Sequence, residues 1–245
     1  SVGVQSLEDA HLSWMNRAHG TQEARWALQN LPKLGFANYS VDLMFHLPGL
    51  SQALWRSTLE EVLSHRPPHL SVYALTVEGR NLLAHQVERG EVTLPSDAAF
   101  EDQYTLLHDL ATKTGYRHYE LSNFALPGYE AQHNSSYWQG APYLGIGPAA
   151  HSFWLPHRWA NRANLHHYLA RLEGGALPVD GVETLGRVER FNEMLMLGLR
   201  QEQGVSLQHL EQVWGEDLLR PGPTTLCGCC PSVPWCWKAA LYGFP

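Results

Sequence analysis

Short apolar runs and longer amphipathic stretches alternate along the first 115 residues. Three runs rich in Val, Leu, Tyr and Phe predict strands, over 1–5, 39–45 and 69–75. Five stretches with apolar residues at helical spacing predict helices, over about 7–17, 21–34, 51–66, 80–89 and 96–114. Strands that alternate with helices pair in parallel through crossover connections, so this order predicts an α/β sheet or part of a barrel.

Serine precedes three of these helices. Ser51 and Ser96 are expected to be N-caps, and Ser6 with Asp9 three residues later forms an approximate capping box. Gly35 is expected to end the second helix.

The pattern changes after residue 115. Residues 116–160 are rich in aromatic residues, Gly and Asn with short β-like runs, and from about 163 the pattern is helical again. One apolar stripe at helical spacing is formed by Val188, Phe191, Leu195, Gly198 and Leu199. Residues 205–214 resemble a further short helix.

Composition and charge restrict the protein class. The 245 residues are 44% hydrophobic and 17% charged, which is typical of a globular protein with one or two domains. The net charge of −7 argues against a general nucleic-acid binder. No apolar run reaches the roughly 20 residues of a membrane-spanning helix, so no integral membrane segment is expected.

All four cysteines fall in the last 19 residues, at Cys227, Cys229, Cys230 and Cys236. Their spacing fits no common zinc pattern, and a disulfide framework would spread cysteines along the chain. The body is therefore predicted to be cytoplasmic. Residues 220–245 are predicted to be an atypical Cys-rich tail, aberrant or disordered, with a structured appendage as the alternative.

Two groups of residues are candidates for chemistry. Asp42 interrupts an apolar strand, where an ion pair or a hydrogen bond is the favoured interpretation and a ligand contact the alternative. Gln5 ends the first strand in the same way, and Arg17 lies one helix downstream, where a solvated charge is the alternative. In the aromatic segment, His133 is a suitable axial ligand for haem iron, although ordinary core packing is favoured from chemistry alone.

The order of motifs resembles a known family. Four segments resemble the second half of a radical S-adenosylmethionine (SAM) domain of the oxygen-independent coproporphyrinogen III oxidase-like group, at residues 1–6, 16–19, 41–49 and 69–76. Four more are similar to its HemW branch, at residues 119–125, 133–138, 143–152 and 191–204. Ala149 stands where that branch usually has Gly.

The resemblance implies a fold and a division into domains. The fold implied is α/β: the later half of a partial (β/α)6 radical SAM barrel, over 1–115, followed by a smaller, mainly helical C-terminal domain over 116–219. The chain enters its first strand without a Met and has no C-x3-C-x2-C cluster motif, so we expect an N-terminally truncated, inactive piece.

The resemblance also implies cofactors and their residues: SAM, a [4Fe–4S] cluster and haem. By position, Gln5, Arg17 and Asp42 correspond to SAM contacts, which reverses the structural interpretation of Asp42. His133 corresponds to the residue implicated in haem binding and is the candidate ligand of haem iron. Three further residues are assigned to cofactor binding: Tyr137, Trp138 and His151.

The function implied is that of a haem chaperone, whose partners are haem or a porphyrin and haem-acceptor proteins. The alternative is an oxygen-independent coproporphyrinogen III oxidase, so enzyme activity stays open. The His-Asn-x-x-Tyr-Trp motif at 133–138 favours the chaperone. Peripheral association with a membrane also stays open.

Overall fold

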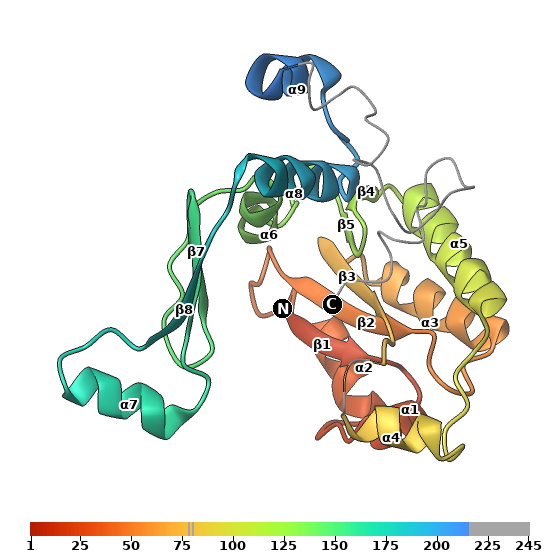
Figure 1. Cartoon of the computed structure of the whole chain (residues 1–245). Helices are drawn as coiled ribbons and strands as arrows, with labels where there is room; N and C mark the ends of the chain where they lie inside the picture. Colours follow the sequence, from red (N-terminus) through yellow and green to blue (C-terminus); the bar gives the residue numbers. More distant parts are fainter. Residues whose placement is uncertain (78, 80, 216–245) are drawn as a thin grey trace. The chain divides into compact units, whose positions relative to one another are not determined.

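The computed structural model describes residues 1–77, 79 and 81–215. The predicted tail at 220–245 therefore lies outside the described residues. The chain divides into two compact units, Ser1–Ala131 and the part from Gln132 on (Figure 1). This division does not test the predicted domain limits, which stay predictions.

The first unit is built on a five-stranded sheet with the order β1-β2-β3-β5-β4. Its parallel part consists of β1 (Val2–Gln5), β2 (Ser40–Phe45) and β3 (His69–Ala74), which confirms the predicted parallel strands. The hairpin β4 (Arg117–Glu120) and β5 (Asn123–Ala125) extends the sheet antiparallel to β3.

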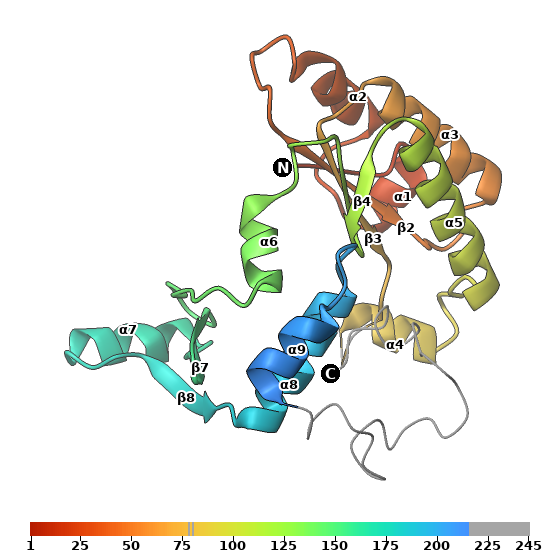
Figure 2. The same cartoon turned by 90° about the horizontal axis from the view of Figure 1, so that it is seen from above.

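Helices cover one face of this sheet. They are α1 (Asp9–Trp14), α2 (Thr21–Asn30), α3 (Gln52–Ser64) and α5 (Asp97–Lys113), and a further helix, α4 (Leu82–Glu88), follows β3. Figure 2 shows α3 and α5 side by side. Phe45 packs between them, with its ring 5.9 Å from Trp55 and 5.2 Å from Phe100 between centroids. The predicted caps Ser51 and Ser96 are confirmed, since each hydroxyl accepts a backbone N–H three residues on.

The first two helices differ from expectation. The first begins at Asp9 rather than Leu7, because the Ser6 hydroxyl accepts from the N–H of Glu8 and lies 3.3 Å from His11 Nδ1 instead of capping. The second ends at Asn30, four residues early, because Pro32 has no N–H to continue the helix.

The second unit contains a three-stranded antiparallel sheet, β6-β7-β8, and helices. The strands are β6 (His151–Trp154), β7 (His157–Asn161) and β8 (Val179–Thr184). The helices are α6 (Gln132–Trp138), α7 (Leu165–Glu173), α8 (Arg187–Leu199) and α9 (Leu207–Trp214). The expectation of a continuous helical pattern from residue 163 is wrong at β8, which is held by its ladder with β7.

Along the described ranges, no helix has the length and hydropathy to cross a membrane.

Gln103 on α5 ties the loop between β2 and α3 to the core at two points. Its Oε1 accepts the His46 N–H at 2.8 Å, and its Nε2 donates to the Leu50 carbonyl at 2.9 Å. The side chain is only 2% exposed, so water cannot replace either partner. The loop after β2 therefore depends on one buried amide.

We expect Gln103→Met to lower the free energy of unfolding by about 2–4 kcal/mol, because it leaves a buried N–H and a buried C=O unpaired. Urea unfolding measures the change. Gln52→Met is the matched control: it removes an exposed amide that donates to Asp102, and the change should stay within about 0.5 kcal/mol. Equal effects of the two variants would contradict a structural role for Gln103.

Candidate functional site

The sheet of the first unit has one apolar and one polar face. In β2, Val41 and Leu43 are fully buried, whereas Ser40 and Asp42 alternate with them and face the other way. Register pairs Ser40 with His69 and Asp42 with Ser71 on β3. The alternation in two neighbouring strands thus gathers four polar side chains on the face opposite Phe45.

Ser40 is the centre of a hydrogen-bonded group on this polar face. Its Oγ lies 3.3 Å from Asp42 Oδ1, 2.8 Å from His69 Nδ1 and 3.1 Å from Ser71 Oγ. An ionised carboxylate only accepts, so the Ser40 hydroxyl donates to Asp42. The Ser40 oxygen can then accept from His69 Nδ1–H.

His69 continues this chain of hydrogen bonds toward β4. Its Nε2 lies 2.8 Å from the Tyr119 hydroxyl, whose oxygen accepts the Ala131 N–H at 3.2 Å. With Nδ1 protonated, Nε2 accepts from Tyr119, so each donor points toward Asp42. Burial lowers the pKa of His69 to about 4, although the nearby negative charge of Asp42 acts to raise it. The ring is therefore neutral at pH 7.

Gln5 lies on the same side of the sheet as Asp42. Its Nε2 is 2.7 Å from the position that a Cβ on Gly3 would occupy, and Gly3 pairs with Asp42 in the sheet. The amide therefore folds over Gly3, where any larger residue would displace it. Arg17 lies exposed just beyond α1, and in the residues that the structure describes its side chain makes no hydrogen bond or ion pair with Gln5 or Asp42.

Asn123 extends the polar row across β5. It pairs with Ser71, is 3% exposed, and its Oδ1 has no hydrogen-bond partner within the described part of the chain. Sequence reasoning singled out Asp42 but missed Ser40, His69 and Ser71. Polar residues at every second position of an apolar strand were the available signal.

In the second unit, His133 lies exposed on α6 next to Tyr137. The two rings are 4.8 Å apart between centroids and nearly perpendicular, at 82°. Tyr137 meets Tyr143 with the same distance and angle. Over the described ranges, the His133 ring makes no hydrogen bond. A ring nitrogen is therefore available to an iron ion, and these residues fit a haem ligand.

An open pocket of about 310 Å³ lies in the second unit. Most of its walls are aromatic or aliphatic, and three lining residues are charged: Arg158, Arg190 and Glu193. The predicted site residues Tyr137 and Trp138 line it, whereas His151, exposed on β6, is not among the lining residues. The remaining aromatic walls are Tyr143, Phe153 and Trp214.

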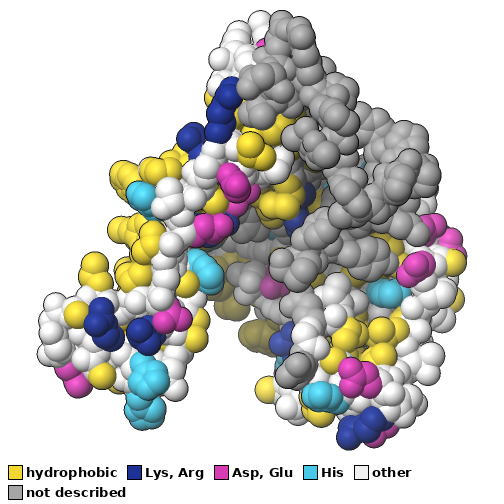
Figure 3. Space-filling view, in the orientation of Figure 1, with side chains coloured by type: hydrophobic (Ala, Val, Ile, Leu, Met, Phe, Trp, Pro, Cys, Tyr) yellow, Lys and Arg dark blue, Asp and Glu magenta, His cyan; other side chains and the backbone are white. Residues whose placement is uncertain are grey.

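The three-stranded sheet of the second unit also carries exposed hydrophobic side chains. Figure 3 shows hydrophobic side chains gathered along β7 and β8. Trp154, Leu155 and Val182 are 60%, 46% and 63% exposed. Leu155 also lines the pocket, whereas Trp154 and Val182 lie on the face of the sheet opposite the pocket-lining Phe153.

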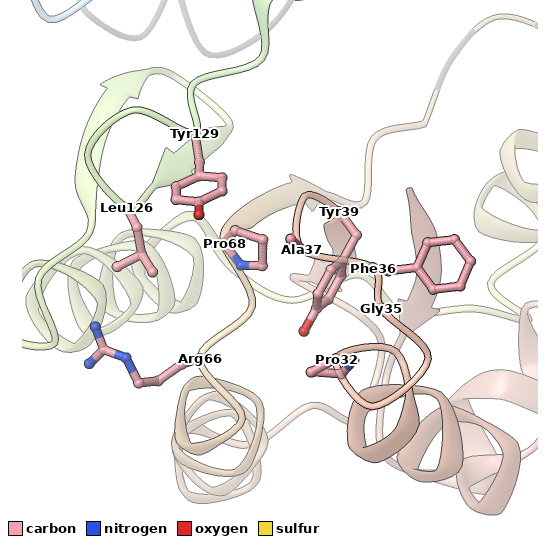
Figure 4. A pocket seen from close by; sticks show the side chains of 9 residues that line it. All are labelled: Pro32, Gly35, Phe36, Ala37, Tyr39, Arg66, Pro68, Leu126 and Tyr129. Atoms are coloured by element: carbon pink, nitrogen blue, oxygen red, sulfur yellow. The ribbon is translucent and has the colours of Figure 1, made fainter.

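A separate pocket of about 270 Å³ lies in the first unit, at the amino ends of β2 and β3 (Figure 4). Tyr39, Tyr129 and Phe36 line it together with Arg66 and prolines. None of the predicted site residues belongs to it. It lies at the opposite end of the strands from Gln5.

The described residues do not fit a [4Fe–4S] cluster. They contain no cysteine, since all four cysteines lie beyond residue 215. No group of three or more His, Cys, Asp or Glu among them is arranged to hold a metal ion.

No family model matches the chain. It is 35% identical over 214 residues to the haem chaperone HemW of Lactococcus lactis, and 35% identical over 219 residues to the mitochondrial radical SAM domain-containing protein 1 of Danio rerio. Both alignments cover 86% of this chain, and they cover 55% and 49% of the relatives. The HemW of Escherichia coli is 40% identical over 151 residues, which cover 62% of this chain and 39% of that protein. The chain spans about half the length of the first two relatives.

One solved structure has the same fold. The coproporphyrinogen III oxidase HemN of Escherichia coli, a radical SAM enzyme, superposes with a TM-score of 0.69 at 19% identity. The match covers 86% of this chain and 51% of that one. The predicted α/β fold of the radical SAM type is confirmed.

The buried His69 predicts a pH dependence. The unfolded side chain binds a proton near pH 6.5 and the folded one only near pH 4, so stability falls as the pH drops through this window. The loss is on the order of 3 kcal/mol. In urea unfolding at several pH values, His69→Gln should flatten the curve between pH 6.5 and 4. The exposed-residue control His166→Gln should keep the wild-type slope, and an unchanged slope in His69→Gln would contradict a neutral His69.

Proposed function

The chain is a homologue of the HemW haem chaperones with a radical SAM-type fold, and on that premise we propose that it binds haem through His133 and passes it to acceptor proteins. The observation that carries the proposal is the exposed imidazole of His133 beside an aromatic pocket. The iron is part of the cargo, not of a resident catalytic centre.

The pocket residues support haem binding by packing. Tyr137 lies against His133 and lines the pocket together with Trp138, so a planar ring ligated at His133 can lie against aromatic walls. His133 comes from a seven-residue helix and is exposed, so its bond to iron is open to exchange with a ligand from another protein. The exposed side chains of Trp154 and Val182 on the three-stranded sheet offer an apolar surface for such an acceptor.

We also propose that the polar face of the first unit binds SAM, with Gln5, Asp42 and Arg17 as contacts. The Gln5 amide lies over Gly3 beside Asp42. Ser40 holds Oδ1 of Asp42 and thereby orients the carboxylate toward a ligand hydroxyl. Because the described residues offer no ligands for an iron–sulfur cluster, the role proposed for them is to bind SAM without cleaving it. The cysteine-free body is consistent with a cytoplasmic location, which is part of the proposal.

A coproporphyrinogen III oxidase is the alternative, favoured by the fold shared with HemN. Both functions require a tetrapyrrole, but only the oxidase turns it over. Coproporphyrinogen turnover under anaerobic, reducing conditions, without stoichiometric haem binding, would favour the oxidase.

Haem titration followed by Soret absorbance tests the ligand. We expect His133→Ala to weaken haem binding at least tenfold, since even outer partners of a metal ligand are worth about 10–100-fold. His166→Ala, which removes another exposed helical histidine, is the control and should bind like wild type. Wild-type binding by His133→Ala would reject His133 as the ligand.

Calorimetry with SAM tests the polar face. Asp42→Ala should lower the SAM affinity about tenfold or more, because a hydrogen bond to a charged group contributes about 1.5–3 kcal/mol. Asp109→Ala, at an exposed position on α5, is the matched control. If Asp42→Ala retains the wild-type affinity, Asp42 does not belong to a SAM site.

A further inference from the structure

Arg190 on α8 is an uncompensated positive charge in the aromatic pocket. The pocket's other guanidinium, that of Arg158, lies 2.7 Å from Glu193 Oε1 and 3.9 Å from Glu183 Oε2, so two carboxylates already pair with it. In the described part of the chain, Arg190 has no ion pair, and its guanidinium lies 5.4 Å from the Trp214 ring centroid. The pocket therefore has apolar walls and one guanidinium, that of Arg190, that is left without a carboxylate partner among the described residues.

Such a pocket favours a planar, apolar ligand with an anionic edge. The guanidinium presents a rigid fork of N–H donors that matches a carboxylate in bidentate geometry. Its contact with the Trp214 face holds this fork in place without engaging its N–H donors in a hydrogen bond. A tetrapyrrole with propionate side chains has both properties, because its ring is apolar and its carboxylates lie along one edge.

Resting on the proposed haem function, we propose that Arg190 binds a propionate carboxylate of the bound tetrapyrrole, so that the pocket recognises the acidic edge of the ring. His133 then ligates the iron, while Arg190 selects for the carboxylates. The two residues act on different parts of one ligand, so their contributions can be separated.

Haem and haem dimethyl ester, which has the same ring without the charges, test this assignment on the full chain. We expect the wild type to bind haem about tenfold tighter than the ester. Arg190→Gln should lose this preference by weakening haem binding and leaving ester binding unchanged. Arg190→Lys keeps the charge without the fork and should retain part of the preference. Arg56→Gln, at an exposed ion pair with Glu60, is the control and should keep it all.

The outcomes separate this inference from the proposed function. Equal binding of haem and ester by the wild type, or an unchanged preference in Arg190→Gln, would overturn the role of Arg190. The haem function would survive either result if His133→Ala still lost the Soret band. A loss of ester binding in Arg190→Gln would also overturn the assignment, because it would indicate damage to the Trp214 wall. No haem binding by the wild type would reject both.

Discussion

The alternation of side chains in β2 is the constraint on which the first unit depends. Val41, Leu43 and Phe45 are 0–2% exposed and fill the space under α3 and α5. Because the side-chain period of a strand is two, burying these three residues forces Ser40 and Asp42 onto the opposite face. A slip of one residue would bury the carboxylate under the helices and expose the apolar set. The core thus fixes the register, and the register presents Asp42 to the polar face.

On the polar face, buried polar groups must be hydrogen-bonded to offset the loss of water. His69 is 4% exposed, and a charged imidazole there would be costly, so the ring stays neutral and acts as both donor and acceptor. Ser40 receives this chain of hydrogen bonds and directs it to Asp42. The carboxylate is consequently oriented by residues of two strands and, through Tyr119, by the hairpin that follows.

The sequence pattern predicted those elements that depend on neighbouring residues alone. It missed elements whose conformation depends on a partner far away in the sequence. The helices after Ser51 and Ser96 were predicted with their caps because a cap needs only the next three residues. The cap predicted at Ser6 is wrong because the N–H of Glu8 and the ring of His11 occupy that hydroxyl. β8 was missed because most of its side chains are exposed and its ladder partner β7 lies some twenty residues earlier. For the same reason, the hydrogen bond between Ser40 and His69 was not predicted, because it depends on the register between β2 and β3.

The chemistry of the two units favours a carrier over an oxidase. A carrier must hold a tetrapyrrole firmly enough to exclude competitors and loosely enough to release it to an acceptor. In the second unit, the proposed ligand His133 on a short exposed helix and an open pocket with aromatic walls meet both demands. Arg190, the residue proposed to bind a propionate, lines the same pocket of the second unit and lies against Trp214. Recognition of the acidic edge there anchors the ring for transfer.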